Sequence, residues 1–323
     1  MRKVTQRKDI VSISQLPLGL WNEMEERFMR LKKLLTGVFL AATTLSLLAC
    51  GGNGGSDSNS NGANSGSGDT QKEQIGNDSV VTITGSTSVE KIVNLMKSEF
   101  EALNPGITIQ YTGSGSSAGI KDTIAKTNNI GASSRELTDE EKAENMTETV
   151  FAYDGIAVAV NPANKVKNLT LEQLQGIYSG EITNWKEVGG DDAEIFVVSR
   201  EESSGTRSAF EELIKLEEVN GLTSNAAVSE GNGPAQIAIA GNENAIGYIS
   251  FAYIDDTVKA VTVNSVEPTV ENVKNNTYPL SRPFLFVSFD NQVSEAGKKF
   301  LEFAVSADGQ ACVEKDNAIR IDK

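Results

Sequence analysis

The amino-acid sequence predicts an α/β fold, in which helices cover both faces of a parallel or mixed β-sheet. From Val80 onward, short runs rich in β-branched residues alternate with Gly/Ser/Thr loops and amphipathic helices. The composition fits this fold, because 39% of the residues are hydrophobic and only 6% are aromatic, as in cores built from Val, Ile and Ala. With 323 residues, the chain is also long enough to form two lobes.

The first strand and helix show the pattern most clearly. A strand is expected at residues 80–84, followed by a helix at 88–103 whose apolar residues recur every three or four positions. This helix ends before Asn104-Pro105-Gly106, a typical stop signal. An uninterrupted apolar run at 155–160 is typical of a buried parallel strand. The same pattern predicts further strands at 107–111, 129–132, 195–199, 245–249, 259–263 and 284–288, and helices at 120–126, 171–177, 207–215 and 295–306.

Composition and charge exclude several classes of function. The chain lacks histidine, and its formal net charge is −15. Without histidine it has neither the commonest general base nor the commonest metal ligand, and we expect no metal site and no cofactor. Nucleic acid is excluded as a partner, because phosphate backbones are bound by clusters of Lys and Arg that are not found here. An anionic ligand would have to be held by donors close to it.

The N-terminal segment is predicted to direct and anchor the protein. Basic residues precede an apolar run at 34–48, and the sequence that ends in Ala49-Cys50-Gly51 resembles a lipobox. We therefore interpret residues 1–49 as a signal peptide and Cys50 as the lipidated residue of the mature protein. The apolar run is shorter than the roughly 20 residues that a membrane-spanning helix needs.

Two further features of this segment concern its limits. Residues 1–28 carry mixed charges that are unusual ahead of a signal peptide, so Met29 is an alternative start. Residues 51–78 consist mainly of Gly, Ser, Asn and Asp, a composition typical of a flexible linker. The folded part is therefore expected to begin at Ser79.

Three loops share one construction, in which a predicted strand leads through small polar residues to the start of a helix. They are Gly85-Ser86-Thr87-Ser88, Gly113-Ser114-Gly115-Ser116-Ser117-Ala118-Gly119 and Arg200-Glu201-Glu202-Ser203-Ser204-Gly205-Thr206. Free backbone N–H groups and the helix dipole favour an anion at a helix N-terminus, and hydroxyls add further donors. Arg200 supplies the one fixed cation, a planar fork that suits two oxygens of a tetrahedral oxyanion.

Simpler interpretations of these loops also exist. Ser and Thr before a helix are ordinary N-caps, Gly/Ser clusters are ordinary turns, and Arg200 could form a surface ion pair with Glu201 or Glu202. Any one loop would favour these interpretations. The occurrence of three such loops in one chain favours an anion site.

Two other kinds of site, a serine-hydrolase active site and a nucleotide-binding site, are alternatives to this interpretation. The stretch from Gly115 to Gly119 matches the G-x-S-x-G pattern of serine hydrolases, but a Ser-His-Asp triad needs a histidine. A serine nucleophile paired with Lys121 is the remaining hydrolase alternative. Neither G-x-x-x-x-G-K-[ST] nor G-x-G-x-x-G occurs, which argues against a nucleotide.

With these loops, residues 80–323 resemble the phosphate-binding receptors of bacterial phosphate-specific ABC importers, the PstS family of the type II periplasmic-binding-protein superfamily. The matching stretches, in chain order, are Gly85-Ser86-Thr87-Ser88-Val89, Gly115-Ser116-Ser117-Ala118-Gly119-Ile120-Lys121, Ile130-Gly131-Ala132-Ser133-Ser134-Arg135-Glu136-Leu137, Gly180-Glu181-Ile182-Thr183-Asn184-Trp185, Arg200 through Thr206, and Ala245-Ile246-Gly247-Tyr248.

The resemblance implies an α/β, two-lobed fold, each lobe a mixed sheet flanked by helices, with a hinge between them and the ligand in the cleft. Lobe I would comprise residues 79–153 and 251–323, and lobe II residues 154–250. The function implied is that of a monomeric transport receptor, not an enzyme, that delivers phosphate to the permease subunits of an ABC importer at the outer face of the cytoplasmic membrane. The phosphate contacts implied are Thr87, Ser88, Ser116, Ser134, Arg200, Ser204, Gly205 and Thr206.

Ser134 departs from the family pattern, because the best-known members have an aspartate there that accepts a hydrogen bond from protonated phosphate. We expect Asp154, a charge that opens an otherwise apolar strand, to supply this acceptor, with Glu136 as second candidate. Alternatively, Asp154 caps a turn or pairs with Arg135 or Arg200. Since a site made only of donors discriminates poorly, sulfate or molybdate remains an alternative ligand.

Overall fold

The computed structural model describes residues 79–322. The predicted signal peptide at 1–49, the alternative start Met29, the lipidated Cys50 and the linker at 51–78 lie outside this range. Within it, no helix combines the length and the apolar character needed to cross a membrane.

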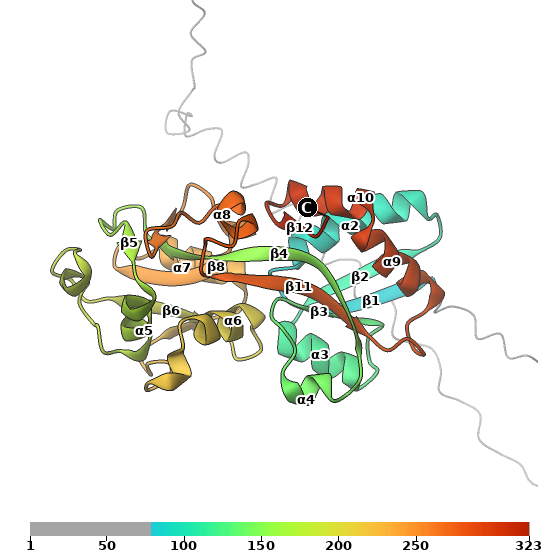
Figure 1. Ribbon diagram of the computed structural model, residues 1–323, viewed down its shortest axis with the longest axis horizontal. Coiled ribbons are helices and arrows are strands. Elements are labelled where there is room, and N and C mark those ends of the chain that lie inside the picture. Colours follow the sequence, from blue (N-terminus) through green and yellow to red (C-terminus); the bar gives the residue numbers. More distant parts are fainter. Residues whose placement is uncertain (1–78, 323) are drawn as a thin grey trace, which may run out of the picture. The chain divides into compact units, whose positions relative to one another are not determined.

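A 10-stranded sheet organises the described residues, with the order β2-β1-β3-β11-β4-β8-β6-β7 and with β9 and β12 attached to β4. On one side of the sheet's middle, β1 (Val80–Gly85) lies between β2 (Thr108–Gly113) and β3 (Ile130–Ser133) and runs parallel to both. On the other side, β6 (Phe196–Arg200) runs parallel to β7 (Ala227–Ser229) and β8 (Ala245–Ser250). We call these two groups, with their helices, the first and second lobes (Figure 1).

Two long strands pass from one lobe to the other (Figure 1). The 14-residue β4 (Thr147–Val160) pairs with β11 (Ser281–Ser288) up to Gly155 and with β8 from Ile156 onward, antiparallel in both cases. The run at 155–160 was expected to be a parallel strand, and that expectation is wrong. It is buried on both faces as predicted, but it is the second half of a crossing strand whose neighbours return from later in the chain.

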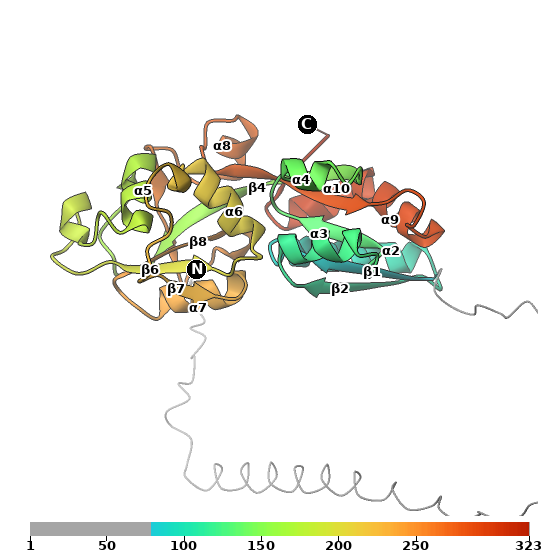
Figure 2. The same ribbon diagram turned by 90° about the horizontal axis from the view of Figure 1, so that it is seen from below.

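Helices flank the sheet in both lobes. The first lobe carries α2 (Glu90–Leu103), α3 (Ser116–Ile124), α4 (Asp139–Lys142), α9 (Glu295–Val305) and α10 (Ala307–Lys315), and the second carries α5 (Leu171–Ser179), α6 (Gly205–Leu213), α7 (Asn232–Ala240) and α8 (Val270–Lys274). The remaining strands are short: β5 (Asn168–Leu169), β9 (Lys259–Ala260), β10 (Thr262–Val263) and β12 (Ile319–Arg320). Figure 2 shows α7 on one side of β6 and β8, with α5 and α6 on the other.

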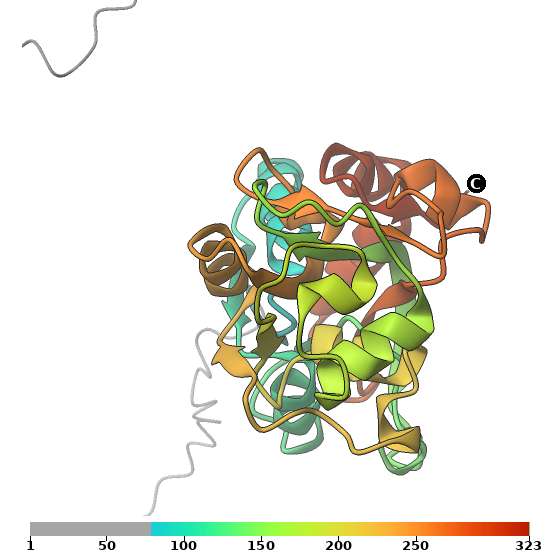
Figure 3. The same cartoon turned by 90° about the vertical axis from the view of Figure 1, so that its left-hand side faces the viewer.

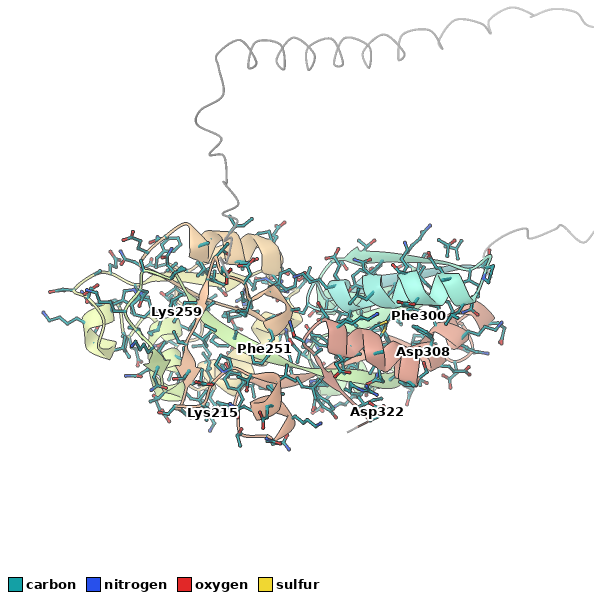
Figure 4. All side chains as sticks on the ribbon, turned by 90° about the horizontal axis from the view of Figure 1, so that it is seen from above. Lys215, Phe251, Lys259, Phe300, Asp308 and Asp322 are labelled. Atoms are coloured by element: carbon teal, nitrogen blue, oxygen red, sulfur yellow. The ribbon has the colours of Figure 1, made fainter. Side chains whose placement is uncertain are left out.

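Each lobe has its own hydrophobic core. In the first lobe, Ile92, Met96 and Phe100 of α2 share a core with residues of β1 and α9. The rings of Phe100 and of Phe300 on α9 meet edge to face, with their centroids 5.4 Å apart. Figure 4 labels Phe300 in this lobe. In the second lobe, the ring of Phe210 on α6 stacks on that of Tyr248 on β8, with their centroids 4.1 Å apart. These cores fix the strand ends from which the polar loops project.

The segment that follows β8 packs with the second lobe. Val261, Val273 and Tyr278 belong to the core that also contains Phe210 and Tyr248. The sequence placed residues 251–280 in lobe I, and this packing places them with lobe II instead. We propose that lobe II runs from residue 154 to 280, where β11 carries the chain back. Figure 3 looks onto the end formed by this lobe, with the yellow-green segment around α5 facing the viewer.

A glycine controls how the first loop leaves its strand. Gly85 ends β1 with φ at +147°, and a Cβ atom there would lie 2.0 Å from the carbonyl oxygen of Ala132. We expect Gly85→Ala to lower the free energy of unfolding by about 1–3 kcal/mol more than a φ penalty alone, because overpacking is added to backbone strain. Urea unfolding followed by circular dichroism measures this difference.

Gly106→Ala is the matched control, since Gly106 has φ at +97° but no atom within 4 Å of the added Cβ. Its free energy of unfolding should fall by only about 1–2 kcal/mol, the cost of placing a residue with a Cβ atom at positive φ. If the two variants lose the same free energy of unfolding, the close contact between Gly85 of β1 and Ala132 of β3 does not require glycine.

Candidate functional site

Six hydroxyl groups gather where the two lobes meet, and we call them the hydroxyl cluster. Its members, all buried except for the partly buried Thr87, are Ser86, Thr87, Ser88, Ser116, Ser134 and Thr206. The first five belong to the first lobe and Thr206 to the second. Hydrogen bonds within the cluster include Ser86 to Ser134 at 2.7 Å and Ser88 to Thr206 at 2.8 Å.

The local fold explains why these residues meet. β1, β2 and β3 of the first lobe are neighbours, so the loops that follow them emerge at one edge of the sheet. From the second lobe, the loop after β6 and the start of α7 approach the same place. Three helices therefore begin at the cluster, α3 at Ser116, α6 at Gly205 and α7 at Asn232. The first N–H groups of a helix have no partner within it and favour an anion.

The contact between the lobes is close at Gly205. A Cβ atom there would lie 2.1 Å from Ser116 Oγ and 2.8 Å from Ser134 Oγ, so glycine is needed for this approach. The neighbouring Ser204 accepts a hydrogen bond from the backbone N–H of Arg207 at 3.2 Å. Its hydroxyl therefore serves as the N-cap of α6, the simpler of the two roles that the sequence suggested.

Arg200 lies at the end of β6 with only 1% of its side chain exposed. Glu201 holds its Nε at 2.9 Å and its Nη2 at 2.8 Å, and Nη2 also donates to Thr87 Oγ1 at 3.1 Å. Burial alone would raise the pKa of Glu201, but the bonds and charge of Arg200, with the N–H of Gly231, outweigh it and lower the pKa. Glu201 is therefore ionised and balances the guanidinium.

One nitrogen of Arg200 is left over. Nη1 is buried and has no hydrogen-bond partner among residues 79–322. Buried polar atoms are satisfied in the large majority of cases, and a bound water or ion is one explanation of an exception. Nη1 is the only charged donor among the five buried side-chain atoms of residues 79–322 that lack a partner. Nη1 is thus a charged donor ready for an acceptor from outside the protein.

The structure adds a second buried guanidinium, so the expectation that Arg200 is the only fixed cation is wrong. Arg282, at the start of β11, donates from Nη1 to Ser134 Oγ at 3.2 Å and from Nη2 to Ser88 Oγ at 3.0 Å. Its position could have been noticed, because Arg282 opens an apolar strand just as Asp154 does. The sequence argument applied that reasoning to the acid alone.

Asp154 is the partner of Arg282. The two residues lie opposite each other in the β4–β11 ladder, and Asp154 Oδ2 accepts from Nε at 3.2 Å and from Nη2 at 2.9 Å. Both side chains are at most 2% exposed. Burial raises the pKa of Asp154, although the charge and hydrogen bonds of Arg282 and hydrogen bonds from Ser250 and Phe251 oppose this.

From these contacts we propose a role for Asp154 that differs from the one expected from the sequence. Its carboxylate is bonded to Arg282 rather than to a hydroxyl of the cluster, so we assign it to holding Arg282 and not to accepting a proton from the ligand. It does not pair with Arg135, which forms a two-bond ion pair with Glu141 at 2.7 and 2.8 Å, nor with Arg200. The second candidate acceptor, Glu136, is exposed.

Asn232 is a donor that the sequence argument did not identify. Its Nδ2 donates to Thr87 Oγ1 at 3.1 Å and to Ser88 Oγ at 2.9 Å, which bridges the lobes. The signal was weak, because Gly231-Asn232-Gly233-Pro234 reads as an ordinary turn.

The alternative of a serine nucleophile has no support in this geometry. The nucleophile position of the pattern is Ser117, whose Oγ accepts from Arg135 Nη2 at 3.0 Å. Lys121 is exposed on α3 and forms no hydrogen bond to Ser117 within residues 79–322. A general base must be within hydrogen-bond reach of the proton that it removes. The arrangement is instead suited to holding an anion with hydroxyl, amide and guanidinium donors.

Comparisons with known proteins agree with this picture. A model of the PBP superfamily domain matches residues 60–308, which include the whole hydroxyl cluster and both arginines. The chain is 34% identical over 254 residues to the phosphate-binding protein PstS of Borreliella burgdorferi, covering 76% of this chain and 91% of that protein.

Solved structures give the same result. One from Clostridium perfringens, assigned to phosphate ABC transporter substrate-binding proteins and containing bound phosphate, is 47% identical with a TM-score of 0.73, covering 75% of this chain and 99% of that one. An ABC-type phosphate transport receptor from Vibrio cholerae is 39% identical with a TM-score of 0.65, covering 74% and 99% of the two chains.

The ion pair between Asp154 and Arg282 yields a prediction about stability. Asp154→Asn would leave a buried guanidinium without its countercharge, so we expect a loss of about 3–5 kcal/mol in the free energy of unfolding. The measurement is denaturant unfolding of the purified variant. Glu136→Gln is the control, because that exposed side chain should change stability by no more than about 0.5 kcal/mol. A loss below about 1 kcal/mol for Asp154→Asn would show that Arg282 does not depend on this partner.

Proposed function

Because the chain belongs to the PstS family of phosphate-binding proteins, within the PBP superfamily, we propose that it is an extracytoplasmic receptor that captures inorganic phosphate for an ABC importer. It is a transport receptor rather than an enzyme, and phosphate binds reversibly between its two lobes. The observation that carries the proposal is the buried Nη1 of Arg200, a charged donor beside six hydroxyls that has no partner in the part of the chain that the structure describes.

The phosphate site takes donors from both lobes. The contacts we assign are those expected from the sequence, namely Thr87, Ser88, Ser116, Ser134, Arg200, Ser204, Gly205 and Thr206, to which we add Asn232 and Arg282. Hydroxyls and amides contribute hydrogen bonds, the start of α6 contributes backbone N–H groups, and Arg200 contributes a charge-assisted bond. Such bonds hold a tetrahedral anion without any carboxylate touching it.

Closure of the lobes follows from this division of the donors. An anion that bonds to Thr87 on one lobe and to Thr206 on the other has its full set of partners only when the lobes are together. It therefore stabilises the closed arrangement by its differential affinity for that state. β4 and β11 are the strands about which the lobes would open, and the importer would read the closed form.

The N-terminal segment would hold this receptor at the membrane. We place it at the outer face of the cytoplasmic membrane, with residues 1–49 removed and Cys50 carrying acyl chains. Stable attachment by lipid takes two chains, which a diacylated cysteine supplies. The linker at 51–78 would let a monomeric receptor reach the permease subunits.

Arg200 provides the direct test of this function. We expect wild-type protein freed of phosphate to bind inorganic phosphate in a calorimeter, and Arg200→Gln to bind it about 10- to 150-fold more weakly, since a charge-assisted hydrogen bond contributes about 1.5–3 kcal/mol.

Lys186→Gln is the matched control, because it removes the same charge from a side chain that is 70% exposed and paired with Asp192. Its affinity should equal that of the wild type. If a folded Arg200→Gln protein binds phosphate as tightly as the wild type does, phosphate is not held at this site.

A further inference from the structure

The hydrogen bonds of the hydroxyl cluster determine which way its protons point. A hydroxyl has one proton to donate and two lone pairs that accept. Thr87 Oγ1 accepts from Arg200 Nη2 and from Asn232 Nδ2, both at 3.1 Å. Its lone pairs are therefore filled by groups that can only donate, and its own proton is left for another acceptor.

Ser88 and Ser134 are in the same condition. Ser88 Oγ accepts from Asn232 Nδ2 at 2.9 Å and from Arg282 Nη2 at 3.0 Å. Ser134 Oγ accepts from Ser86 Oγ at 2.7 Å and from Arg282 Nη1 at 3.2 Å. Both hydroxyls must then donate their own protons, Ser88 to Thr206 Oγ1 at 2.8 Å and Ser134 to Ser116 Oγ at 3.3 Å.

The orientation of Asn232 is fixed independently. Its Oδ1 accepts from the backbone N–H of Ser250 at 3.1 Å, which leaves Nδ2 for the cluster. A flip of the side-chain amide would lose this bond, so Asn232 Oδ1 cannot accept a hydrogen bond from Thr87 or Ser88. This part of the site presents donors only.

The carboxylates that pair with the two buried arginines are occupied. Glu201 bonds to Arg200 and to the N–H of Gly231, and Asp154 bonds to Arg282. Among residues 79–322, no Asp or Glu side chain hydrogen-bonds to a hydroxyl of the cluster. Ser116 Oγ already accepts from the N–H of Ser134 at 3.0 Å and from Ser134 Oγ at 3.3 Å, so its own proton is left for a ligand. The cluster hydroxyls that keep a lone pair for a protonated ligand oxygen are Ser86 and Thr206, which are neutral.

We propose that this site recognises fully ionised tetrahedral oxyanions as a class, and that Ser134 is the residue that sets this breadth. The inference rests on the proposed function, since it concerns the same pocket. A ligand such as sulfate, which has four acceptor oxygens and no proton, satisfies every donor. Hydrogen phosphate is also held, but its single O–H finds only a hydroxyl partner and gains little over sulfate.

The magnitude follows from how selectivity arises. A site built to hydrogen-bond a ligand O–H rejects the analogue lacking it by about 10⁴- to 10⁵-fold, because a buried group of the protein is then left unpaired. Here no carboxylate is left unpaired or repelled when sulfate binds. We therefore expect phosphate to be preferred over sulfate by less than about 100-fold.

The test titrates the purified protein, freed of phosphate, with inorganic phosphate and with sulfate in separate calorimetric experiments at neutral pH. Ser134→Asp places a carboxylate among the donors, and we expect it to raise the preference for phosphate at least about tenfold by weakening sulfate, since a carboxylate repels an unprotonated anion. Ser98→Asp, which adds the same charge on the exposed face of α2, should leave the ratio unchanged.

The outcomes separate this inference from the proposed function. If neither anion binds, the proposed function fails and the inference fails with it. If phosphate binds and is preferred over sulfate by more than about 100-fold, the inference alone is overturned. A folded Ser134→Asp variant with the wild-type ratio would remove Ser134 from the role assigned here. Because the wild-type ratio is measured first, misfolding of the variant leaves the main test intact.

Discussion

Two guanidinium groups buried where the lobes meet are the constraint on which the rest of the site depends. Burying a charge is unfavourable unless it is paired and hydrogen-bonded, and each arginine has its own carboxylate, Glu201 for Arg200 and Asp154 for Arg282. With their charges balanced, the arginines can direct their remaining N–H groups at Thr87, Ser88 and Ser134. The hydroxyls are thereby turned into donors. A site of this kind would attract an anion although the chain as a whole carries a net charge of −15.

The same residues connect the hydroxyl cluster to the strands that join the lobes. Asp154 and Arg282 are opposite each other on β4 and β11, the strands that join the lobes. Arg282 therefore bonds to the hydroxyl cluster from the position about which the lobes would turn. Thr206 and Asn232 contact the cluster from the second lobe. Ligand contact and lobe position are thus linked through a few bonds, without a separate relay.

Much of the fold could be predicted from the sequence, because its elements carry clear periodicity. The apolar face of α2 and the strands β1, β6 and β8 were placed to within a few residues. α7 was missed because Gly, Pro, Ala and Ile leave it without a polar face. The direction of β4 relative to its neighbours could not be predicted from the sequence either. A strand that is buried on both faces has the same apolar sequence pattern whether its neighbours are parallel or antiparallel.

The site was predicted in part, for a physical reason. Loops that precede helices carry a local signature, and it pointed to Thr87, Ser88, Ser116 and Thr206, which the structure brings together in the hydroxyl cluster. Arg282 and Asn232 carry no such signature, because their function comes from side chains that reach across from distant segments. Asp154 was noticed for its charge, but its partner decides its role. Pairings of this kind depend on the register of β4 and β11, which local sequence does not encode.

The most direct test of the account is to locate a bound oxyanion. In a crystal of the protein grown with arsenate, a tetrahedral analogue of phosphate, anomalous scattering would mark the arsenic atom. The account predicts a single peak within the hydroxyl cluster, with one arsenate oxygen in hydrogen-bond range of Arg200 Nη1. A peak outside the cluster, with Nη1 still lacking a ligand oxygen, would contradict it.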